Sequence, residues 1–182
     1  MSSMNRSQAE RFELMWRAHA GEVLAYCRRR SPTSAEDALA ETFLVAWRRL
    51  DQLPAEPLPW LFGVARRILA NQRRAASRGE ALLQRIGEDE LRRDQVTREP
   101  SQVIEAVEML SETDRETLRL QAWEGLSAAD AAVVLGCSAV AFRLRLHRAR
   151  RRLERAVCEL ESGDASQPLS RLALPARGGR ND

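Results

Sequence analysis

The chain has 182 residues, of which 44% are hydrophobic and 30% are charged, so it can form one or two small globular domains. All 29 basic side chains are arginine, and the formal net charge is +3. No run of 18 apolar residues is present, and the N-terminal segment carries charges where a signal peptide has its apolar core. We therefore expect a cytoplasmic protein.

The composition also argues against an enzyme. The three cysteines and two histidines lie far apart in the sequence, without the spacing of a disulfide framework or a zinc site. No nucleophile-base pair, P-loop or dinucleotide fingerprint is found. We therefore expect no catalysis, no metal, no cofactor and no small-molecule substrate.

The first half of the chain has the periodicity of three helices. Apolar residues recur at helical spacing from a start at Ser7, with Glu10 as its capping partner, to about Arg30. Ser34 is predicted to cap a second helix that ends near Leu50. Three prolines then interrupt regular structure, and Pro59 stands in the first turn of a third helix.

The third predicted helix carries a block of arginines. Residues 66–78 hold five arginines and no acid, whereas residues 79–116 hold 11 acids and five arginines. Arg67, Asn71, Arg74 and Arg78 fall at i, i+4, i+7 and i+11, so they share one stripe. Such a stripe is commonly just solvated, but this concentration of unpaired cations favours an anionic partner.

The second half predicts a helix-turn-helix. Ser111, Ser127 and Ser138 each precede a helical pattern, and Gly125 and Gly136 stand where the turns need a left-handed residue. The last helix carries seven arginines, which are Arg143, Arg145, Arg148, Arg150, Arg151, Arg152 and Arg155. A solvated charged face is the plain alternative, but the spacing of serines and glycines favours DNA binding.

The same helix has an apolar side that we expect to dock on its scaffold. Helical spacing places on this apolar side Val140, Leu144 or Leu146, Ala149, Leu153 and Val157.

Two separated segments together resemble one family. Residues 35–50 and 59–74, AEDALAETFLVAWRRL and PWLFGVARRILANQRR, resemble region 2 of bacterial sigma factors. Residues 111–153 resemble their region 4. With only these two regions and a short linker, the chain is similar to the extracytoplasmic-function group of the sigma-70 family. The resemblance covers about residues 10–160.

The resemblance implies an all-α protein with two small domains and a role for each segment. It implies a region 2 domain over 8–78 and a region 4 domain over 101–160. The composition itself predicts a charged linker over 79–100 and a disordered tail over 161–182. The implied partners are core RNA polymerase, promoter DNA and an anti-sigma factor. The polymerase would supply the chemistry.

The resemblance also implies site residues. The surface that docks on core polymerase would be formed by Asp37, Glu41, Thr42 and Trp47, with Phe43 in the core. The loop over 51–58 would capture a flipped base of the -10 element, and Trp60 and Leu61 would pack. The -10 region would be read by Arg66, Arg67, Asn71, Arg73 and Arg74. The -35 element would be contacted by Ser138, Ala139, Arg143, Arg145 and Arg148.

The chain also departs from the family pattern. Residues 65–67 read Ala-Arg-Arg where many members have Ala-Arg-Asn, and Asn71 follows where they have Asp. Residues 130–132 read Asp-Ala-Ala in place of Glu-Ile-Ala, and residues 140–143 read Val-Ala-Phe-Arg in place of Gly-Thr-Val-Lys. The promoter sequence therefore does not follow from those of relatives. A stand-alone helix-turn-helix regulator is the alternative function, although it leaves residues 35–50 and the arginines of 66–78 unexplained.

Overall fold

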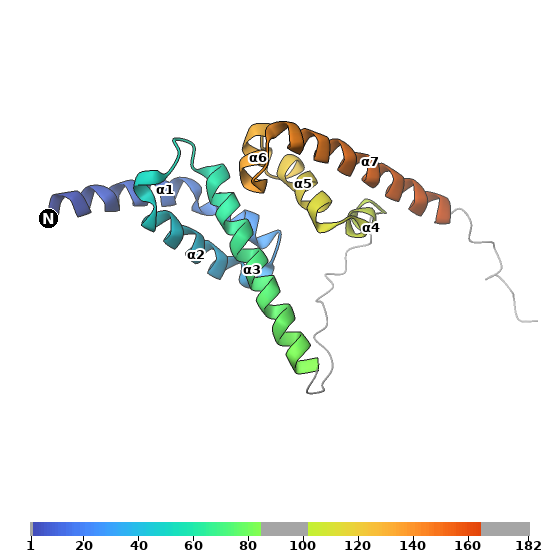
Figure 1. Ribbon diagram of the computed structural model, residues 1–182, viewed down its shortest axis with the longest axis horizontal. Helices are drawn as coiled ribbons and strands as arrows, with labels where there is room; N and C mark the ends of the chain where they lie inside the picture. The colour runs from blue at the N-terminus through green and yellow to red at the C-terminus, as the bar shows by residue number, and fades with distance from the viewer. Residues whose placement is uncertain (1, 85–101, 165–182) are drawn as a thin grey trace, which may run out of the picture.

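The computed structural model describes residues 2–84 and 102–164, and within these ranges it contains α-helices and short 3-10 turns but no strand. The first domain comprises α1 (Ser2–Arg28), α2 (Ala35–Arg48) and α3 (Leu58–Gln84). The second comprises α4 (Gln102–Met109), α5 (Glu112–Ala122), α6 (Ala128–Leu135) and α7 (Ala139–Asp164) (Figure 1). The predicted all-α fold with two helical domains is confirmed.

Several helix ends follow from the local sequence. The Ser111 and Ser127 hydroxyls each accept a hydrogen bond from the backbone N–H three residues later, at 3.2 Å. The Ser138 hydroxyl likewise accepts from Ala141 N at 3.1 Å. Gly125 and Gly136 have φ values of +62° and +65°, a conformation in which a side chain would be strained. The three predicted helix starts and both glycine turns are therefore confirmed.

In the first domain, the observed helix starts agree less well with the starts predicted from the sequence. α1 already begins at Ser2, so Ser7 lies inside the helix and not at its cap. α2 begins directly after Ser34, as predicted, but the Ser34 side chain makes no capping hydrogen bond. Pro59 stands in the first turn of α3, which continues to Gln84. The rest of the predicted linker, from residue 85 to 100, lies outside the described residues.

The second domain has one helix that the sequence analysis did not predict. α4 packs against α7, and its Ala106 is fully buried. The helix is short, and its apolar residues Val103, Ile104 and Met109 are exposed, so its sequence lacks a clear one-sided pattern. α7 continues to Asp164, and residues 165–182 lie outside the described residues.

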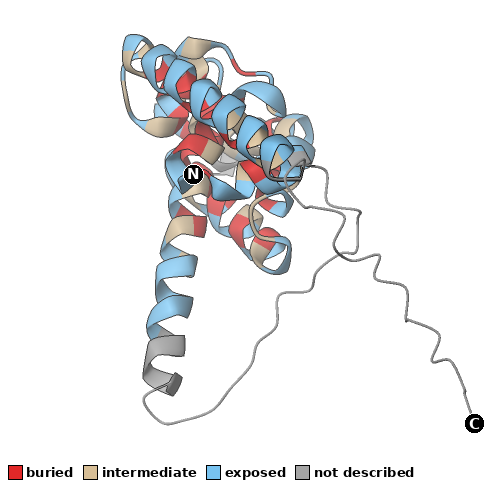
Figure 2. Ribbon diagram, turned by 90° about the vertical axis from the view of Figure 1, so that its right-hand side faces the viewer, coloured by how far each residue is buried: buried red, intermediate tan, exposed pale blue. Residues whose placement is uncertain are grey.

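The buried residues form a core that crosses from one domain to the other. One continuous apolar cluster includes Leu61 and Phe62 of α3 together with Ala131 and Val134 of α6. Figure 2 shows the buried residues concentrated where the helices pack together. α3 and α6 approach closely at Gly63, where an added Cβ would lie 3.6 Å from the Val134 Cα. The two domains therefore pack against each other in this structure.

The predicted docking side of α7 was partly wrong. Val140 and Leu144 are 60% and 53% exposed, whereas Phe142, Leu146 and Ala149 are buried. At about 3.6 residues per turn, the predicted set combined two opposite faces of one helix. The structure assigns the inward face to Phe142 and leaves Val140 and Leu144 outside.

None of the helices in residues 2–84 and 102–164 combines the length and the apolar character that a membrane crossing requires.

Candidate nucleic-acid interface

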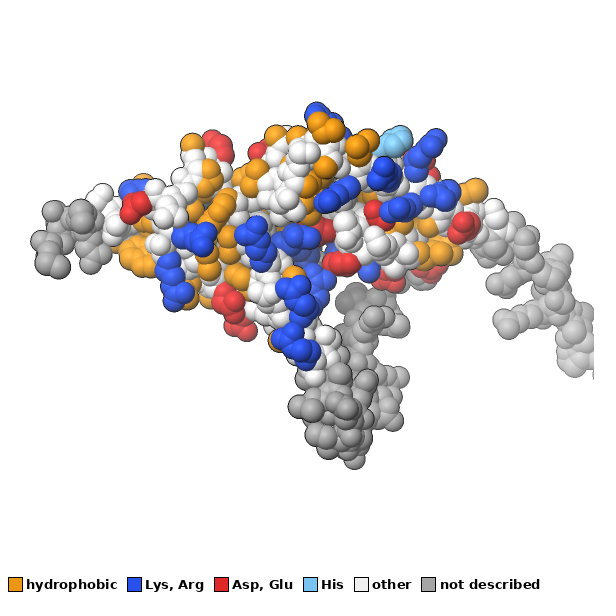
Figure 3. Space-filling model, viewed as in Figure 1, with side chains coloured by type: hydrophobic (Ala, Val, Ile, Leu, Met, Phe, Trp, Pro, Cys, Tyr) orange, Lys and Arg blue, Asp and Glu red, His pale blue; other side chains and the backbone are white. Residues whose placement is uncertain are grey.

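The arginines of α3 lie on two sides of that helix. At about 100° per residue, Arg66 and Arg73 share one side, whereas Arg67, Asn71 and Arg78 share a second. The first side faces α5 of the other domain, and Arg73 Nη1 donates to Glu112 Oε1 at 2.8 Å. The second side is exposed to solvent. Figure 3 shows a row of basic side chains along α3 on the face in view. The predicted -10 residues are thus on one helix but not on one face.

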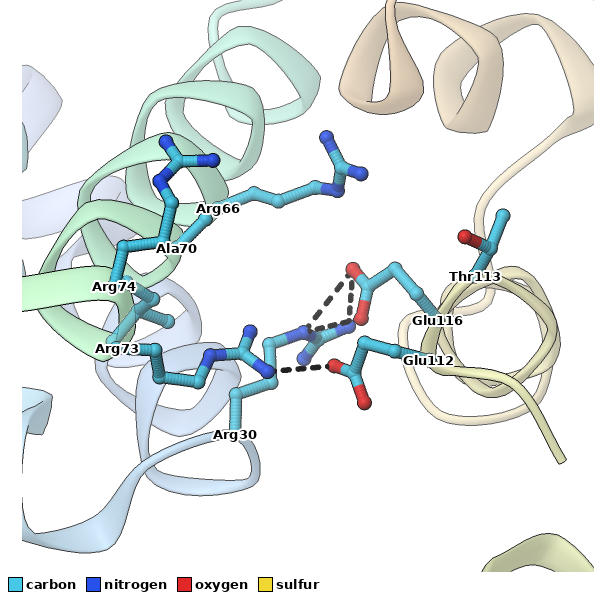
Figure 4. A pocket seen from close by; sticks show the side chains of 9 residues that line it. Arg30, Arg66, Ala70, Arg73, Arg74, Glu112, Thr113 and Glu116 are labelled. Atoms are coloured by element: carbon cyan, nitrogen blue, oxygen red, sulfur yellow. Dashed lines mark hydrogen bonds and ion pairs between the residues drawn. The ribbon is translucent and has the colours of Figure 1, made fainter. Parts of the chain in front are cut away.

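A cavity of about 260 Å³ lies between α3 and α5. Figure 4 shows Arg66 and Arg73 extending from α3 towards Glu112 and Glu116 of α5. Arg66 has no ion-pair partner among the described residues, and Arg74 donates to its helix neighbour Asn71. The cavity is lined by Arg30, Arg66, Leu69, Ala70, Arg73, Arg74, Glu112, Thr113 and Glu116. It is therefore a place where arginines of the first domain meet acids of the second, and where Arg30 and Arg73 are paired with Glu116 and Glu112.

The pKa of Glu112 reports this neighbourhood. Partial burial acts to raise its pKa, but the hydrogen bond and charge of Arg73, together with the charges of Arg115 and Arg119, lower it below the ordinary value. The carboxylate of Glu112 is thus held in its charged form against α3.

Next to this cavity, a buried group of charges joins the end of α1 to the second domain. Arg30, whose side chain is 2% exposed, donates to Glu116 at 2.8 Å and to Glu124 at 2.9 Å. The Tyr26 hydroxyl donates to Glu116 Oε1 at 2.9 Å, and the Arg30 guanidinium lies 3.4 Å from the centre of the Tyr26 ring. Burial, and next the Glu116 charge, raise the pKa of Tyr26 well above its usual value. Arg29 also pairs with Glu124.

The segment before α3 borders a second cavity. Arg11 Nη1 pairs with Asp51 Oδ1 at 2.9 Å, which ties α1 to the start of this segment. The cavity has a volume of about 380 Å³ and is lined by Arg11, Leu14, Met15, Leu50, Leu53, Pro54, Ala55 and Pro57. Its size and mainly apolar lining suit a planar ring, and it adjoins the loop over 51–58 that was predicted to hold a flipped base.

The α2 residues predicted to contact polymerase divide into exposed and buried ones. Asp37 and Glu41 are exposed, and Trp47 is 38% exposed with its ring 5.1 Å from that of Phe12. Thr42 is different, because it is fully buried and its hydroxyl donates to the Ala38 carbonyl at 2.6 Å. Thr42 is therefore corrected to a core residue of this conformation. Phe43 is buried, as expected, and so is Leu61.

The exposed face of α7 lies opposite its buried one. At about 100° per residue, Val140 and Leu144 lie on one stripe with Arg151, while Arg143 and Arg148 flank that stripe on either side. Arg145 is about 140° away from Val140 and points to another side. Ser138 is exposed with its hydroxyl used as a cap, and Ala139 is half-buried. All three predicted arginines are therefore exposed, but only Arg143 and Arg148 border the apolar stripe, and Arg145 lies about 60° beyond Arg148.

Two features of these surfaces were missed from the sequence. The exposed Val140 and Leu144 were detectable, because helical spacing alone separates them from Phe142 and Leu146. The pairing of Arg30 with Glu116 had no local signal, since 86 residues separate the two.

The cysteines are free thiols. Burial raises the pKa of the Cys27 thiol to about 11, so it stays protonated at neutral pH. Within residues 2–84 and 102–164, no group of three His, Cys, Asp or Glu side chains is arranged to hold a metal ion.

Comparison with known proteins agrees with these two modules. The family model for sigma-70 region 2 matches residues 15–79, and the one for sigma-70 region 4 matches residues 101–153. The chain is 32% identical over 152 residues to the ECF RNA polymerase sigma factor SigD of Mycobacterium tuberculosis, covering 72% of this chain and 70% of SigD. It is 33% identical over 144 residues to the probable RNA polymerase sigma factor RfaY of Xanthomonas campestris, covering 70% of this chain but 35% of RfaY.

Two solved structures are also similar. CnrH, in complex with the cytosolic domain of CnrY, is 27% identical with a TM-score of 0.53, covering 86% of this chain and 89% of CnrH. The sigma factor RpoE of Bartonella quintana, in complex with the anti-sigma factor NepR, has the same fold, with 24% identity and a TM-score of 0.61, covering 80% and 96% of the two chains. The chain therefore belongs to the extracytoplasmic-function group of the sigma-70 family.

Proposed function

We propose that this chain binds core RNA polymerase and directs it to promoters by contacting a -10 and a -35 element. The observation that carries the proposal is that one chain holds two arginine-rich helices, α3 and α7, each within a different sigma-70 region. DNA phosphates are the natural counterpart of such helices. The chain recruits the polymerase, and the polymerase catalyses RNA synthesis.

We assign the polymerase contact to the exposed side of α2. Asp37 and Glu41 supply negative charge, and Trp47 supplies a partly exposed aromatic ring beside them. Acidic side chains of this kind complement a basic surface, and an aromatic anchor is typical of interface centres. Thr42 has no part in this contact, because its side chain is buried.

We assign the -10 contact to α3 and the segment before it. Arg66, Arg67, Asn71, Arg73 and Arg74 would contact the backbone and bases of the melted strand. The cavity beside residues 51–58 would receive an unstacked base, since its volume of about 380 Å³ accommodates one. A base that is flipped out of the stack can be held in a pocket between apolar side chains.

We assign the -35 contact to the exposed stripe of α7. The first turns of a recognition helix enter the major groove, where arginine pairs with guanine and apolar side chains contact the thymine methyl group. Arg143 and Arg148 flank Val140 and Leu144 on this stripe, so both kinds of contact are available. Arg145 lies on the far side of Arg148 from this stripe, about 140° from Val140, and we assign it to a contact with a DNA phosphate.

An anti-sigma factor is part of the proposal. The structures of RpoE and CnrH are both of complexes, RpoE with the anti-sigma factor NepR and CnrH with the cytosolic domain of CnrY. We infer that this chain is also held inactive by a protein of that kind.

Co-elution with core RNA polymerase tests the proposal against the alternative of a stand-alone regulator. A sigma factor elutes with core polymerase in size-exclusion chromatography, whereas a stand-alone regulator elutes alone and binds duplex DNA without polymerase. The match of residues 15–79 to sigma-70 region 2 favours the first result.

A further inference from the structure

We propose that His147 is a further sequence-reading residue of α7, which donates a hydrogen bond to a guanine of the -35 element and binds it more tightly at lower pH. The proposal rests on the -35 contact proposed above and names one more side chain that makes it. It also gives that contact a dependence on pH that arginine and apolar side chains do not supply, because they keep the same charge between about pH 5 and 8.

His147 lies on the exposed stripe of α7. At about 100° per residue, it is about 20° from Val140 and about 60° from Leu144 around the helix axis. The buried Phe142 and Leu146 are about 100° or more away from it. His147 is exposed, and its imidazole makes no hydrogen bond or ion pair within the part of the chain that the structure describes. Its ring nitrogens are therefore available to a partner outside the chain.

Spacing along α7 brings His147 within reach of base edges. The four residues at i, i+3, i+4 and i+7 of the stripe are Val140, Arg143, Leu144 and His147. Recognition helices contact bases in the major groove with this spacing. His147 lies about 6 Å beyond Arg143 along the helix axis, which exceeds the distance of about 3.4 Å between stacked base pairs. It therefore meets a different base from the one that Arg143 contacts.

The chemistry of the imidazole selects guanine. A protonated imidazole donates from both ring nitrogens and has no acceptor. Guanine is the base that presents two acceptors, O6 and N7, and no donor in the major groove. Arg143 and Arg151, one turn before and one turn after His147, are exposed and attract the DNA phosphates to this part of the stripe.

The contact becomes stronger as the pH falls. Histidine changes its charge between about pH 5 and 8, and a hydrogen bond from a charged donor exceeds one from a neutral donor by about fivefold in affinity. The protonated form prevails at the lower pH, so affinity for the -35 element rises in that direction.

The charged groups near His147 are mainly arginines of its own helix. Arg143, Arg150 and Arg151 lie within about 60° of it around the axis, and Glu154 follows about two turns later. α4, α5 and α6 pack against the buried side of α7, and none of their described charged side chains bonds to His147. These side chains are Glu105, Glu108, Glu112, Asp114, Arg115, Glu116, Arg119 and Asp130. The partner of the charged imidazole is therefore supplied by DNA.

The first experiment determines which base His147 contacts. Holoenzymes with the wild-type chain and with three variants select promoters from a pool with a randomised -35 element. We expect a guanine at one position for wild type and for His147→Arg, since arginine also donates to guanine O6 and N7. The same position should change to adenine for His147→Gln, because glutamine pairs with adenine, and should become random for His147→Ala. The other -35 positions should stay the same in all four selections, which controls for folding.

The second experiment measures the dependence on pH. Competition binding gives the affinity of each holoenzyme for the promoter selected by wild type, at about pH 6 and about pH 8. We expect the ratio of the two affinities to be about fivefold larger for wild type than for His147→Arg and His147→Gln, because arginine and glutamine keep their charge in this range. His19→Gln removes the other histidine, in α1, and should keep the wild-type ratio. The polymerase is the same in every holoenzyme, so its own response to pH cancels from the comparison.

Either of two results would overturn the proposal. One is a selection in which no guanine of the wild-type -35 sequence is lost with His147→Ala. The other is a pH ratio for wild type that both His147→Arg and His147→Gln retain. Failure of the proposed function is distinguishable, because wild-type holoenzyme would then enrich no -35 sequence at all, and this proposal would fail with it.

Discussion

The Arg30 guanidinium donates to both carboxylate oxygens of Glu116, at 2.8 and 3.1 Å from Nε, although 86 residues separate the two in the chain. Both side chains are almost fully buried. This pair, with Glu124, fixes the position of the second domain on the first.

Removing the cation of this pair should destabilise the chain strongly. Arg30→Met leaves the buried Glu116 with only the Tyr26 hydroxyl and the buried Glu124 with only Arg29 as a partner, so we expect the free energy of unfolding to fall by about 3–5 kcal/mol. Adding Glu116→Gln and Glu124→Gln should recover most of that loss. Urea unfolding followed by circular dichroism measures both, and a cost below about 1 kcal/mol for Arg30→Met would show that the pair is not the stabilising contact described here.

The polymerase contact predicts a charge-dependent loss of binding. Replacing Asp37 and Glu41 by Arg should abolish co-elution with core polymerase and leave helicity unchanged, because reversing interfacial charges commonly costs about 2–5 kcal/mol. The matched control is Glu105→Arg with Glu108→Arg on exposed positions of α4. Equal binding by all three proteins would contradict the assignment of α2.

The solvent-exposed residues of α3 should be needed for promoter melting, a step that follows polymerase binding. Arg67→Ala, Asn71→Ala and Arg74→Ala together should reduce open-complex formation without weakening holoenzyme assembly, because their proposed partner is DNA. Permanganate footprinting of the -10 thymines measures the melted strand. A parallel loss of core binding would instead indicate that the first domain is damaged.

The arginines of α7 should separate into base readers and phosphate holders. Arg143→Ala should cost roughly 1–3 kcal/mol on a cognate -35 sequence and little on a scrambled one. Arg151→Ala, further along the helix, should weaken binding to both sequences alike and lower the salt slope by about one unit. Holoenzyme affinity across a salt series distinguishes the two, and an equal effect of Arg143→Ala on both templates would refute the placement of the reading residues.

If Val140 and Leu144 contact a thymine in the -35 element, binding of the holoenzyme should depend on the methyl group of that thymine. Promoters selected by the holoenzyme from a pool with a randomised -35 element should contain a thymine whose replacement by deoxyuridine weakens binding about fourfold, the cost of exposing one methyl group. Holoenzyme carrying Leu144→Ala should no longer distinguish the two bases. Val133→Ala, exposed but outside the recognition helix, is the control. Continued discrimination by the Leu144→Ala holoenzyme would exclude this contact.

The sequence was sufficient for features that depend on neighbouring residues. The caps at Ser111 and Ser127 and the turn at Gly136 were predictable, because each arises from the local backbone. The start of α1 was not, since a favourable cap at Ser7 does not prevent the helix from extending further.

Features that depend on residues far apart in the chain could not be predicted from the sequence. Arg30 was indistinguishable from other arginines, because its burial results from Glu116 and Glu124 on another domain. Thr42 was assigned to a surface by resemblance, whereas packing against its own helix and the core buries it. The division of the α3 arginines into a side that faces α5 and a side that faces solvent likewise requires the position of α5.

The most direct test of the central claim is run-off transcription with purified core RNA polymerase on the DNA upstream of the gene for this chain. The account predicts a discrete transcript that appears only when the chain is added and disappears when Asp37 and Glu41 are replaced by Arg. If the chain binds this DNA without polymerase and core polymerase gives no specific transcript in its presence, the chain does not act as a sigma factor there.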